Sequence, residues 1–273
     1  FNVEIVERRW YSVQEQDASG RVTWKSSVEE IPIQSFTDLT TDAQGEAVVR
    51  FTPPKGGIYR ARVTAQDAQG NLGSASAYMW VAGKEYIPWQ QTNDRGFELV
   101  TDKKTYLPGD TAQVLIASPF QGEAYALVTV ERGRIRQQEV LKLTSNSTIY
   151  ELPIRPDLAP NAYISVLVVK GVDETNPRPN FKMGIAEIQV DTKEQALSVE
   201  VTSDRQTAGP GEQVQYTVRK RDAQGRPVSA EVSLGLSDLA TLSLLPPNSP
   251  PILDFFFSRR NLGVQTSVPL VLS

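Results

Sequence analysis

Short runs in which apolar and polar residues alternate recur along this chain. Residues 3–7, 59–64 and 198–201 alternate with a period of two, and residues 47–51 do so less regularly. This period places successive side chains on the two faces of a strand, so each run predicts a half-buried β-strand. The largely apolar run 164–169 suits a strand that is covered on both faces. The pattern therefore predicts a protein built mainly from β-strands.

Turn signals separate these runs. A shared pattern of Asp, two further residues and Gly occurs at residues 17–20, 42–45, 67–70 and 222–225. The Asp carboxylate can accept hydrogen bonds from backbone N–H groups further on, and Gly can adopt the positive φ that ends such a turn. A calcium site is the alternative interpretation, but such sites need several converging carboxylates and each turn supplies one. We therefore expect strand-connecting turns.

One phrase occurs twice, 102 residues apart. It reads DKKTYLPGD at residues 102–110 and DRQTAGPGE at residues 204–212, and each copy precedes an alternating run. A fixed period of about a hundred residues indicates a row of similar domains, each with its own core. Strands at this spacing, separated by Gly and Pro turns, predict tandem antiparallel β-sandwiches. Residues 237–244 are the best helical candidate, with Ser237 as a cap.

We expect β-sandwich domains joined by short connectors. The predicted boundaries are 1–83 for the first domain, 84–95 for a connector, 96–191 for the second domain and 192–273 for the third. Strand-like runs in the third domain fall near 197–203, 213–221 and 228–236. A Pro-rich stretch and one more strand-like run follow, so we expect this domain to be incomplete. Since the chain begins at Phe1 without Met or a signal peptide, we expect a piece of a longer protein.

Composition excludes several classes of function. The 28 basic and 32 acidic residues are mixed along the chain, whereas a nucleic-acid partner requires a clustered basic face. No run of 18 apolar residues occurs, so we expect no membrane span. The chain contains no His and no Cys, which removes Ser-His-Asp and Cys-His catalysis and the commonest metal ligands. We therefore expect no enzyme activity, no metal and no cofactor.

Two segments carry a resemblance to a known family. Residues 228–242 read VSAEVSLGLSDLATL, and residues 254–266 read DFFFSRRNLGVQT. In this order the pair resembles the bacterial α2-macroglobulin family, in the macroglobulin-type domain that adjoins the bait region. Supporting stretches in the earlier domains are GIYRA at 57–61, VTVERG at 128–133, YELPI at 150–154 and AYISV at 162–166.

The resemblance implies a broad-spectrum endopeptidase inhibitor. In this family a protease cuts an exposed bait segment, the surrounding domains rearrange, and the protease is trapped. Many members also capture the protease through a Cys–Gln thioester, but this chain has no Cys and cannot form one. The implied role is that of a structural segment of a periplasmic or secreted protein. Its partners would be proteases, through the parent protein, and the neighbouring domains.

The candidate site residues lie near the end of the chain. Those that could begin the bait region are Gln265, Thr266, Ser267, Val268, Pro269 and Leu270. The alternative is that residues 267–272, which are apolar and rich in β-formers, are a strand of the third domain. Arg259 and Arg260 form a dibasic pair that a trypsin-like protease would cut if it were exposed, and an ordinary charged strand edge is the alternative.

Aromatic residues allow a second class of function. Trp10, Trp24, Trp80 and Trp89 all fall in the first domain or the connector. A cell-surface array that binds sugar or protein through exposed Trp faces is the alternative to the inhibitor, but we expect these residues to pack in cores and between domains. We likewise expect the aromatics of residues 255–257 to pack inside a sandwich or on a neighbouring domain.

Overall fold

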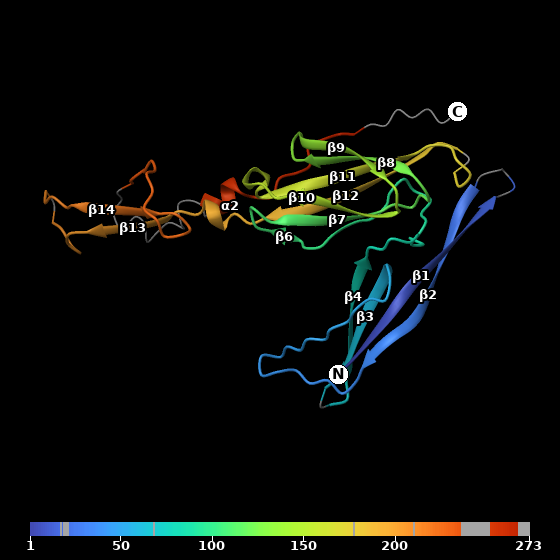
Figure 1. Ribbon diagram of the computed structural model, residues 1–273. Helices are drawn as coiled ribbons and strands as arrows, with labels where there is room; N and C mark the ends of the chain where they lie inside the picture. Colours follow the sequence, from blue (N-terminus) through green and yellow to red (C-terminus); the bar gives the residue numbers. More distant parts are fainter. Residues whose placement is uncertain are drawn as a thin grey trace.

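The computed structural model of the chain describes residues 1–16, 18, 22–67, 69–176, 178–209, 211–235 and 252–266 (Figure 1). Apart from short helical turns the described part is all-β, as the sequence predicts. A first unit at the N-terminus leans away from a central unit, and a hairpin extends from the opposite end of that central unit (Figure 1). The domain boundaries given above remain a prediction.

The first unit is one antiparallel sheet with the strand order β2–β1–β3–β4. Its strands are β1 (Asn2–Gln16), β2 (Val22–Phe36), β3 (Gly57–Gln66) and β4 (Leu72–Val81). One face of this sheet carries the buried side chains of Val3, Ile5 and Tyr59. Leu39 and Phe51, from the segment between β2 and β3, pack against these residues. A connecting segment therefore covers this face.

The strand predicted at residues 47–51 is absent, because these residues pair with no strand of the first unit. They belong to the covering segment, in which Val49 and Phe51 pack on the core and Val48 is 83% exposed. The Phe51 and Tyr59 ring centroids lie 5.5 Å apart. The alternation at 47–51 thus reflects one-sided burial of an extended segment without strand pairing.

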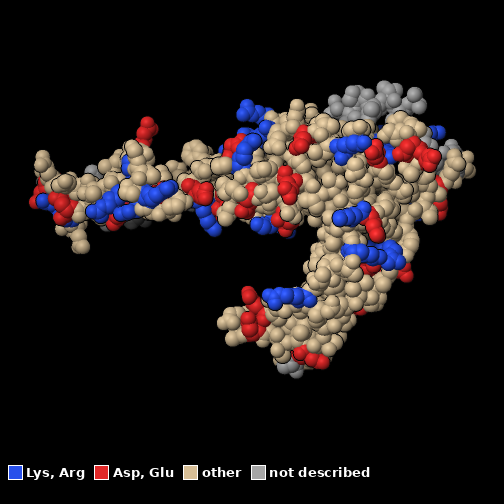
Figure 2. All heavy atoms as spheres, in the orientation of Figure 1, with Lys and Arg blue, Asp and Glu red and all other residues tan. Residues whose placement is uncertain are grey.

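Charged residues occupy the other face of the first sheet. The Arg8 side chain lies 3.4 Å from the Glu30 carboxylate, and Arg60 and Arg62 pair with the same carboxylate. Arg8 also lies over the Trp10 ring, 5.3 Å from its centroid. On the view in Figure 2, basic and acidic residues are interspersed over the molecule. In the described part of the chain, no helix is long and apolar enough to cross a membrane.

The middle unit contains two sheets, with the strand orders β10–β7–β5 and β6–β12–β11–β8–β9. Its elements are β5 (Leu99–Thr101), β6 (Thr105–Tyr106), β7 (Thr111–Ala117), β8 (Ala124–Glu131), β9 (Ile135–Leu143), β10 (Ser147–Pro153), the 3-10 helix η1 (Pro156–Leu158), β11 (Asn161–Lys170) and β12 (Asn180–Val190). Paired strands run antiparallel, but β6 and β12 are parallel. A single hydrophobic core includes residues from both sheets.

Strand β11 lies inside the five-stranded sheet, between β12 and β8. Ile164, Val166 and Val168 are fully buried and face the core. Leu167 and Val169 alternate with them and are half-buried on the outer face. The largely apolar run at 164–169 therefore forms a covered strand, as predicted. Asn161 and Tyr163, which share the outer face with Leu167, are also buried.

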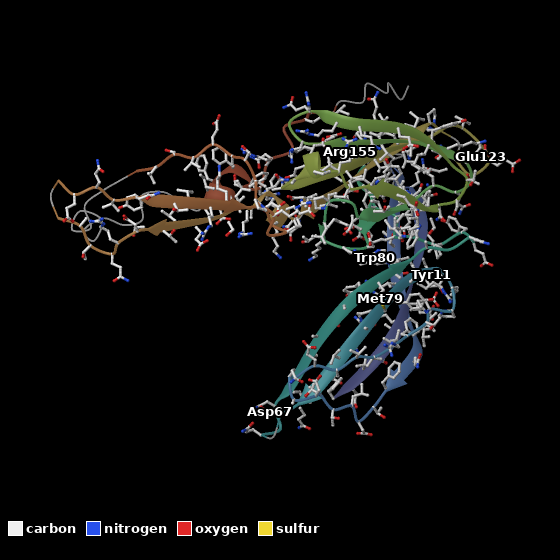
Figure 3. The ribbon with its side chains drawn as sticks, turned by 60° about the vertical axis from the view of Figure 1, so that its left-hand side comes forward. Tyr11, Asp67, Met79, Trp80, Glu123 and Arg155 are labelled. Atoms are coloured by element: carbon white, nitrogen blue, oxygen red, sulfur yellow. The ribbon has the colours of Figure 1, made fainter. Side chains whose placement is uncertain are left out.

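The first and middle units meet in a second hydrophobic cluster. Trp89 is only 5% exposed there and packs with Ile58 and Leu115, while Trp10 and Trp80 pack against the cluster from the first sheet. Figure 3 places Trp80 close to this junction and Asp67 at the far tip of the sheet. The prediction that the Trp residues pack between domains is confirmed for these three. Trp89 therefore presents no free aromatic face of the kind that the sugar-binding alternative requires, and the same packing leaves Trp10 and Trp80 half-buried.

The repeated phrase of the sequence is also a repeat in structure. The Asp102 carboxylate accepts a hydrogen bond from the N–H of Gln113 at 2.8 Å, and that of Asp204 accepts one from Gln215 at 3.1 Å. In both copies the backbone N–H of the first Asp also donates to the carbonyl of the same partner, at 3.0 Å. The opening acid of the phrase thus joins the turn to the strand that follows.

The predicted Asp turns are confirmed where the structure describes them. Asp42 Oδ1 accepts the N–H groups of Gln44 and Glu46, at 3.0 and 2.8 Å. The equivalent bonds are made by Asp67 and Asp222. The glycines that end these turns have φ values of 82°, 88° and 78°. The turn at 17–20 lies outside the described residues. Within the described ranges, no group of three or more potential metal-ligating side chains occurs.

The third unit begins after the 3-10 helix η2 (Lys193–Gln195) and contains an antiparallel pair, β13 (Ser198–Ser203) and β14 (Tyr216–Arg221). Val199 and Val201 are more than half exposed. The strand predicted at 228–236 is wrong over the described residues 228–235, which form no strand. Beside β14 the chain makes an isolated Arg221–Pro227 bridge and a backbone bond from the Val228 N–H to the Lys220 carbonyl at 3.3 Å, and Pro227 has no N–H with which to pair. The helix predicted at 237–244 lies outside the described residues.

Candidate functional site

The chain returns to the middle unit near its C-terminus. After the short helix α2 (Ile252–Phe256), residues 257–263 lie against the five-stranded sheet, and we refer to them as the strap. In Figure 1 this red segment runs from α2 across the middle unit. The strap contains the dibasic pair and is joined to Gln265 through Val264, so both groups of candidate residues lie in it or next to it.

The first anchor of the strap is Asn161, the opening residue of β11. Its Oδ1 accepts the backbone N–H of Arg260 at 2.8 Å, and its Nδ2 donates to the carbonyl of the same residue at 2.9 Å. The Tyr163 hydroxyl donates to that carbonyl as well, at 3.1 Å. Asn161 is 1% exposed, so the strap covers a polar part of the outer face of the sheet. The amide of one side chain thus holds both backbone groups of Arg260.

The second anchor is an ion pair. Arg259 donates from Nε and from a terminal nitrogen to the two oxygens of Glu187, at 2.7 and 2.6 Å. Glu187 lies opposite Tyr163 in the β11–β12 register, which brings it beside the Asn161 anchor. The hydrogen bonds from Arg259 lower the pKa of Glu187, and those from Glu187 raise the pKa of Arg259. Such two-point pairing fixes the direction of a guanidinium as well as its position.

The third anchor is the turn between β8 and β9. The N–H of Gly133 donates to the carbonyl of Leu262 at 2.7 Å. Gly133 and Gly263 have φ values of 66° and 62°, and a Cβ on Gly263 would lie 3.0 Å from the Gly133 Cα. Glycine at position 263 therefore allows the two backbones to approach closely.

A half-buried arginine, Arg132, supports the loop that presents Asn161. Arg132 donates to the carbonyls of Leu158 and Asn161 at 2.9 and 3.1 Å, and also to the carbonyl of Ala159. A further bond reaches the carbonyl of Asp157 at 2.9 Å. Burial lowers the pKa of Arg132. The guanidinium therefore gathers the carbonyls of one loop and fixes the start of β11.

The aromatic residues beside the strap do not form the predicted plug. Phe255 and Phe256 belong to α2 and are 63% and 60% exposed, with ring centroids 5.3 Å apart in an edge-on arrangement. Phe257, at the start of the strap, is half-buried. The prediction that this aromatic run packs inside a sandwich or on a neighbouring domain is wrong for Phe255 and Phe256, because α2 leaves them facing solvent.

The candidate site residues fall into two groups. Arg259 and Arg260 have exposed side chains, but their backbone is held against the middle unit by the anchors described above. Gln265 and Thr266 are exposed, form no strand and follow the strap after Val264. Ser267, Val268, Pro269 and Leu270 lie outside the described residues, so both the bait start and the alternative strand at 267–272 remain predictions.

Sequence reasoning missed the residues that hold the strap. Asn161 precedes the alternating run of β11, and Glu187 is one of several acidic residues in strand-like runs. Nothing in their immediate sequence separates them from ordinary strand residues. Their role depends on contacts over 99 and 72 positions of chain, which no local pattern records.

Comparison with known proteins supplies the family. The bait region domain of alpha-2-macroglobulin matches residues 97–244, a range that ends before the strap. The chain is 31% identical over 241 residues to an alpha-2-macroglobulin of Ralstonia nicotianae, covering 84% of this chain and 14% of that protein. It is 26% identical over 261 residues to an alpha-2-macroglobulin homolog of a Nostoc species, covering 93% of this chain and 14% of that protein.

Two solved structures are also similar. One is Salmonella alpha-2-macroglobulin reacted with methylamine, at 17% identity and a TM-score of 0.34 over 96% of this chain and 16% of that one. The other is the native conformation of the Escherichia coli protein, at 19% identity and a TM-score of 0.32 over 82% of this chain and 14% of that one. The chain thus spans about 14% of the length of the curated relatives compared above. Because the bait region domain matches more than half of its residues, the chain belongs to the alpha-2-macroglobulin family.

Proposed function

We propose that this chain is a structural segment of a protease-trapping protein and that residues 265–270 begin the stretch that proteases cut. The proposal is supported by the position of the strap, which ends just before residues 265–270, and by the family to which the chain belongs. The strap is bonded to the middle unit as far as Leu262 and leads to Gln265 and Thr266, which are exposed and form no strand. A cleavable stretch needs this arrangement, with a fixed scaffold on one side and accessible chain on the other.

The proposed mechanism is mechanical, and the chain contributes no catalytic residue to it. An intact bait stretch joins the domains on its two sides, and cleavage removes that connection. The domains can then relax to another packed arrangement around the protease. The middle unit suits the role of a rigid frame, since a single core joins its two sheets. Because the chain has no Cys, covalent capture would require residues elsewhere in the parent protein.

The proposed location is the periplasm or the outside of the cell, where a protein of this kind would meet foreign proteases. The partners would be proteases of several classes, acting through the parent protein, and the domains that flank this segment.

The proposal is tested on the full-length parent protein. It is incubated with a serine, a cysteine and a metalloprotease, and the first cleavage sites are mapped by mass spectrometry. We expect early cuts at or after residues 265–270, followed by loss of protease activity on large protein substrates but not on small peptides. The control replaces residues 265–270 with Gly and Ser at the same length, which should abolish early cleavage there. The proposal is wrong if no protease is trapped or shielded from large substrates.

A further inference from the structure

We propose that Asn161, Tyr163, Glu187 and the Gly133 N–H form a peptide-docking site on the middle unit, and that this site shields the dibasic pair of the strap from proteolysis. Its occupant is an extended segment of the chain itself, Arg259–Leu262. The exposed side chains of Arg259 and Arg260 would by themselves mark a target for a trypsin-like protease. Because the docking site bonds to the backbone of this segment, we expect slow cleavage there instead.

Asn161 occupies the backbone groups that a serine protease must handle. For cleavage after Arg259, the leaving nitrogen is the Arg260 N–H, which donates to Asn161 Oδ1 at 2.8 Å. For cleavage after Arg260, the scissile carbonyl must enter an oxyanion hole. That carbonyl already accepts bonds from Asn161 Nδ2 at 2.9 Å and from the Tyr163 hydroxyl at 3.1 Å. Asn161 therefore holds one group of each peptide bond that could be cut: the nitrogen of the bond after Arg259 and the carbonyl of the bond after Arg260.

Glu187 occupies the side chain that such a protease reads. A trypsin-like enzyme binds the Arg side chain before the scissile bond through an acidic residue in its specificity pocket. Glu187 takes that part for Arg259, with two hydrogen bonds at 2.7 and 2.6 Å. The protease would have to remove Arg259 from Glu187 before it could bind the side chain itself.

The docked segment is also held beyond the dibasic pair. The Gly133 N–H bonds to the Leu262 carbonyl at 2.7 Å, so backbone groups are fixed at positions 260 and 262. A protease needs several consecutive residues free and extended in its cleft, so the whole strap must leave the sheet before it is cut. Cleavage is then limited by local opening of the strap, and side-chain exposure alone does not predict it.

This shielding sets an N-terminal limit to the cleavable stretch. The bonds of the docked segment Arg259–Leu262 are protected, whereas Gln265 and Thr266 lie past the last anchor. After a cut beyond that point, the N-terminal stump would remain attached to the middle unit. Only this last step rests on the proposed function, because the shielding is a property of the present chain.

The test is limited trypsin digestion of this chain, with cleavage after Arg259 and after Arg50 followed by mass spectrometry. Arg50 is exposed in the covering segment of the first unit, where its neighbours Val49 and Phe51 pack on the core but no strand pairs with the backbone. It serves as an internal reference for a segment held by side-chain packing without the backbone bonds of the strap. We expect cleavage after Arg259 to be at least about tenfold slower than after Arg50, as for a segment that must open locally. Asn161→Ala should accelerate the cut after Arg259 by roughly 10- to 100-fold, through loss of bonds to both backbone groups.

Two surface variants keep the test decisive if Asn161→Ala fails to fold. Glu187→Gln and Arg259→Lys both remove the two-point pair, and the second retains a residue that trypsin cuts. Each should accelerate cleavage after position 259 by about 3- to 10-fold, and the exposed control Glu151→Gln on β10 should not. Equal rates in the unaltered chain and both surface variants would overturn the proposal, as would cleavage after Arg259 as fast as after Arg50. Failure of the parent to trap proteases would leave this result unchanged.

Discussion

Asn146 and Asn161 hold two different segments of the chain in the same way. Asn146 accepts the N–H of Ile87 at 3.1 Å and donates to its carbonyl at 2.6 Å, and Asn161 makes the same pair of bonds with Arg260. Asn146 thereby holds the connector from the first unit, whereas Asn161 holds the strap. Both asparagines are almost fully buried, at 4% and 1% exposure. The middle unit therefore holds the segment that precedes it and the strap that follows it by hydrogen bonds to their backbone groups.

A third asparagine makes a similar contact in the connector itself. Asn93 accepts the N–H of Trp24 at 2.6 Å and donates to its carbonyl at 2.9 Å, which attaches the edge strand β2 to the connector. Every residue except Pro has both a backbone N–H and a carbonyl. Such contacts therefore tolerate changes of side chain in the segment whose backbone is bonded. The asparagines themselves are not replaceable in this way, since each supplies one donor and one acceptor at fixed spacing.

Removal of the Asn146 amide should weaken the junction of the first and middle units. Asn146→Ala leaves the buried N–H of Ile87 without its partner and removes one of the two donors to the Ile87 carbonyl, which keeps the bond from the Trp89 N–H at 2.8 Å. We expect a cost of about 1–3 kcal/mol of unfolding free energy. The Trp89 indole, which donates to the Asn146 carbonyl at 2.7 Å, loses support in the same place. Denaturant unfolding followed by tryptophan fluorescence measures the change.

Asn146→Asp is the matched control for the shape of this side chain. It keeps the acceptor for the Ile87 N–H but places an oxygen against the Ile87 carbonyl, so we expect a loss at least as large as for Ala. Asn71→Ala, at an exposed turn of the first sheet, should be much milder. Equal stabilities for Asn146→Asp and the unaltered chain would show that the donor bond to Ile87 contributes nothing.

Local patterns predicted the parts of the fold that local chemistry determines. The Asp turns depend on residues within four positions of one another, and Asp42 bonds as predicted. The repeated phrase predicted that two parts of the chain are alike, but the bonds that Asp102 and Asp204 make to residues 11 positions further on became clear only from the structure. The alternating runs at 3–7 and 59–64 form strands that bury one side against a covering segment, whereas the run at 198–201 forms β13 with both sides exposed, so its predicted half-burial is wrong. The run at 47–51 shows the limit of this reasoning, since a covering segment and a strand share the same one-sided pattern.

The anchors of the candidate site were beyond the reach of sequence reasoning for a different reason. An Asn side chain that bonds to backbone groups places no requirement on the side chain of its partner residue, so no pair of residue types in the sequence marks the contact. The bond from Asn161 to Arg260 spans 99 positions, and the one from Asn146 to Ile87 spans 59. The dibasic pair was visible as a candidate cleavage site, but the groups that engage it became visible only with the fold.

The packing of β12 against β5 predicts a strong effect at one glycine. A Cβ on Gly184 would lie 2.8 Å from the Leu99 Cγ and 2.9 Å from the Phe97 carbonyl oxygen. Gly184→Ala should therefore cost about 1–3 kcal/mol, because a backbone oxygen and a core side chain must move. Gly171→Ala is the control, since nothing lies within 4 Å of its Cβ position. A thermal unfolding midpoint for Gly184→Ala equal to that of the control would contradict this account of the packing.

Tyr106 should make stability depend on pH in the alkaline range. Its hydroxyl donates to Asp102 at 2.8 Å and accepts the Lys103 N–H at 3.1 Å, and burial, followed by the bond to Asp102, raises its pKa to about 12. Tyr106→Phe should cost about 1–2 kcal/mol at pH 7. A pKa raised by folding favours the folded state below the unfolded pKa of 10.0, and this advantage is lost as pH rises through the folded value.

The difference in unfolding free energy between the unaltered chain and Tyr106→Phe should accordingly shrink between pH 10.0 and about 12. Denaturant titrations of both proteins across this range isolate Tyr106, because the other tyrosines titrate in both. A difference that stays constant over the whole range would mean that Tyr106 ionises as readily in the folded chain as in the unfolded one.

Acid should release the strap. The bonds from Arg259 lower the pKa of Glu187 from its ordinary value of 4.5, so this pair stabilises the docked strap above that value and the contribution is lost as pH falls through the folded pKa. The Arg259 side chain is 62% exposed and solvent screens the pair, so the effect should be modest and should weaken with salt.

Hydrogen exchange of residues 257–263, corrected for the intrinsic effect of pH, should show more frequent opening at pH 3 than at pH 7. Glu187→Gln should open equally often at both, while Glu151→Gln should behave as the unaltered chain. If the unaltered chain opens no more often in acid, the Asn161 and Gly133 bonds alone hold the strap and the ion pair only orients the Arg259 side chain.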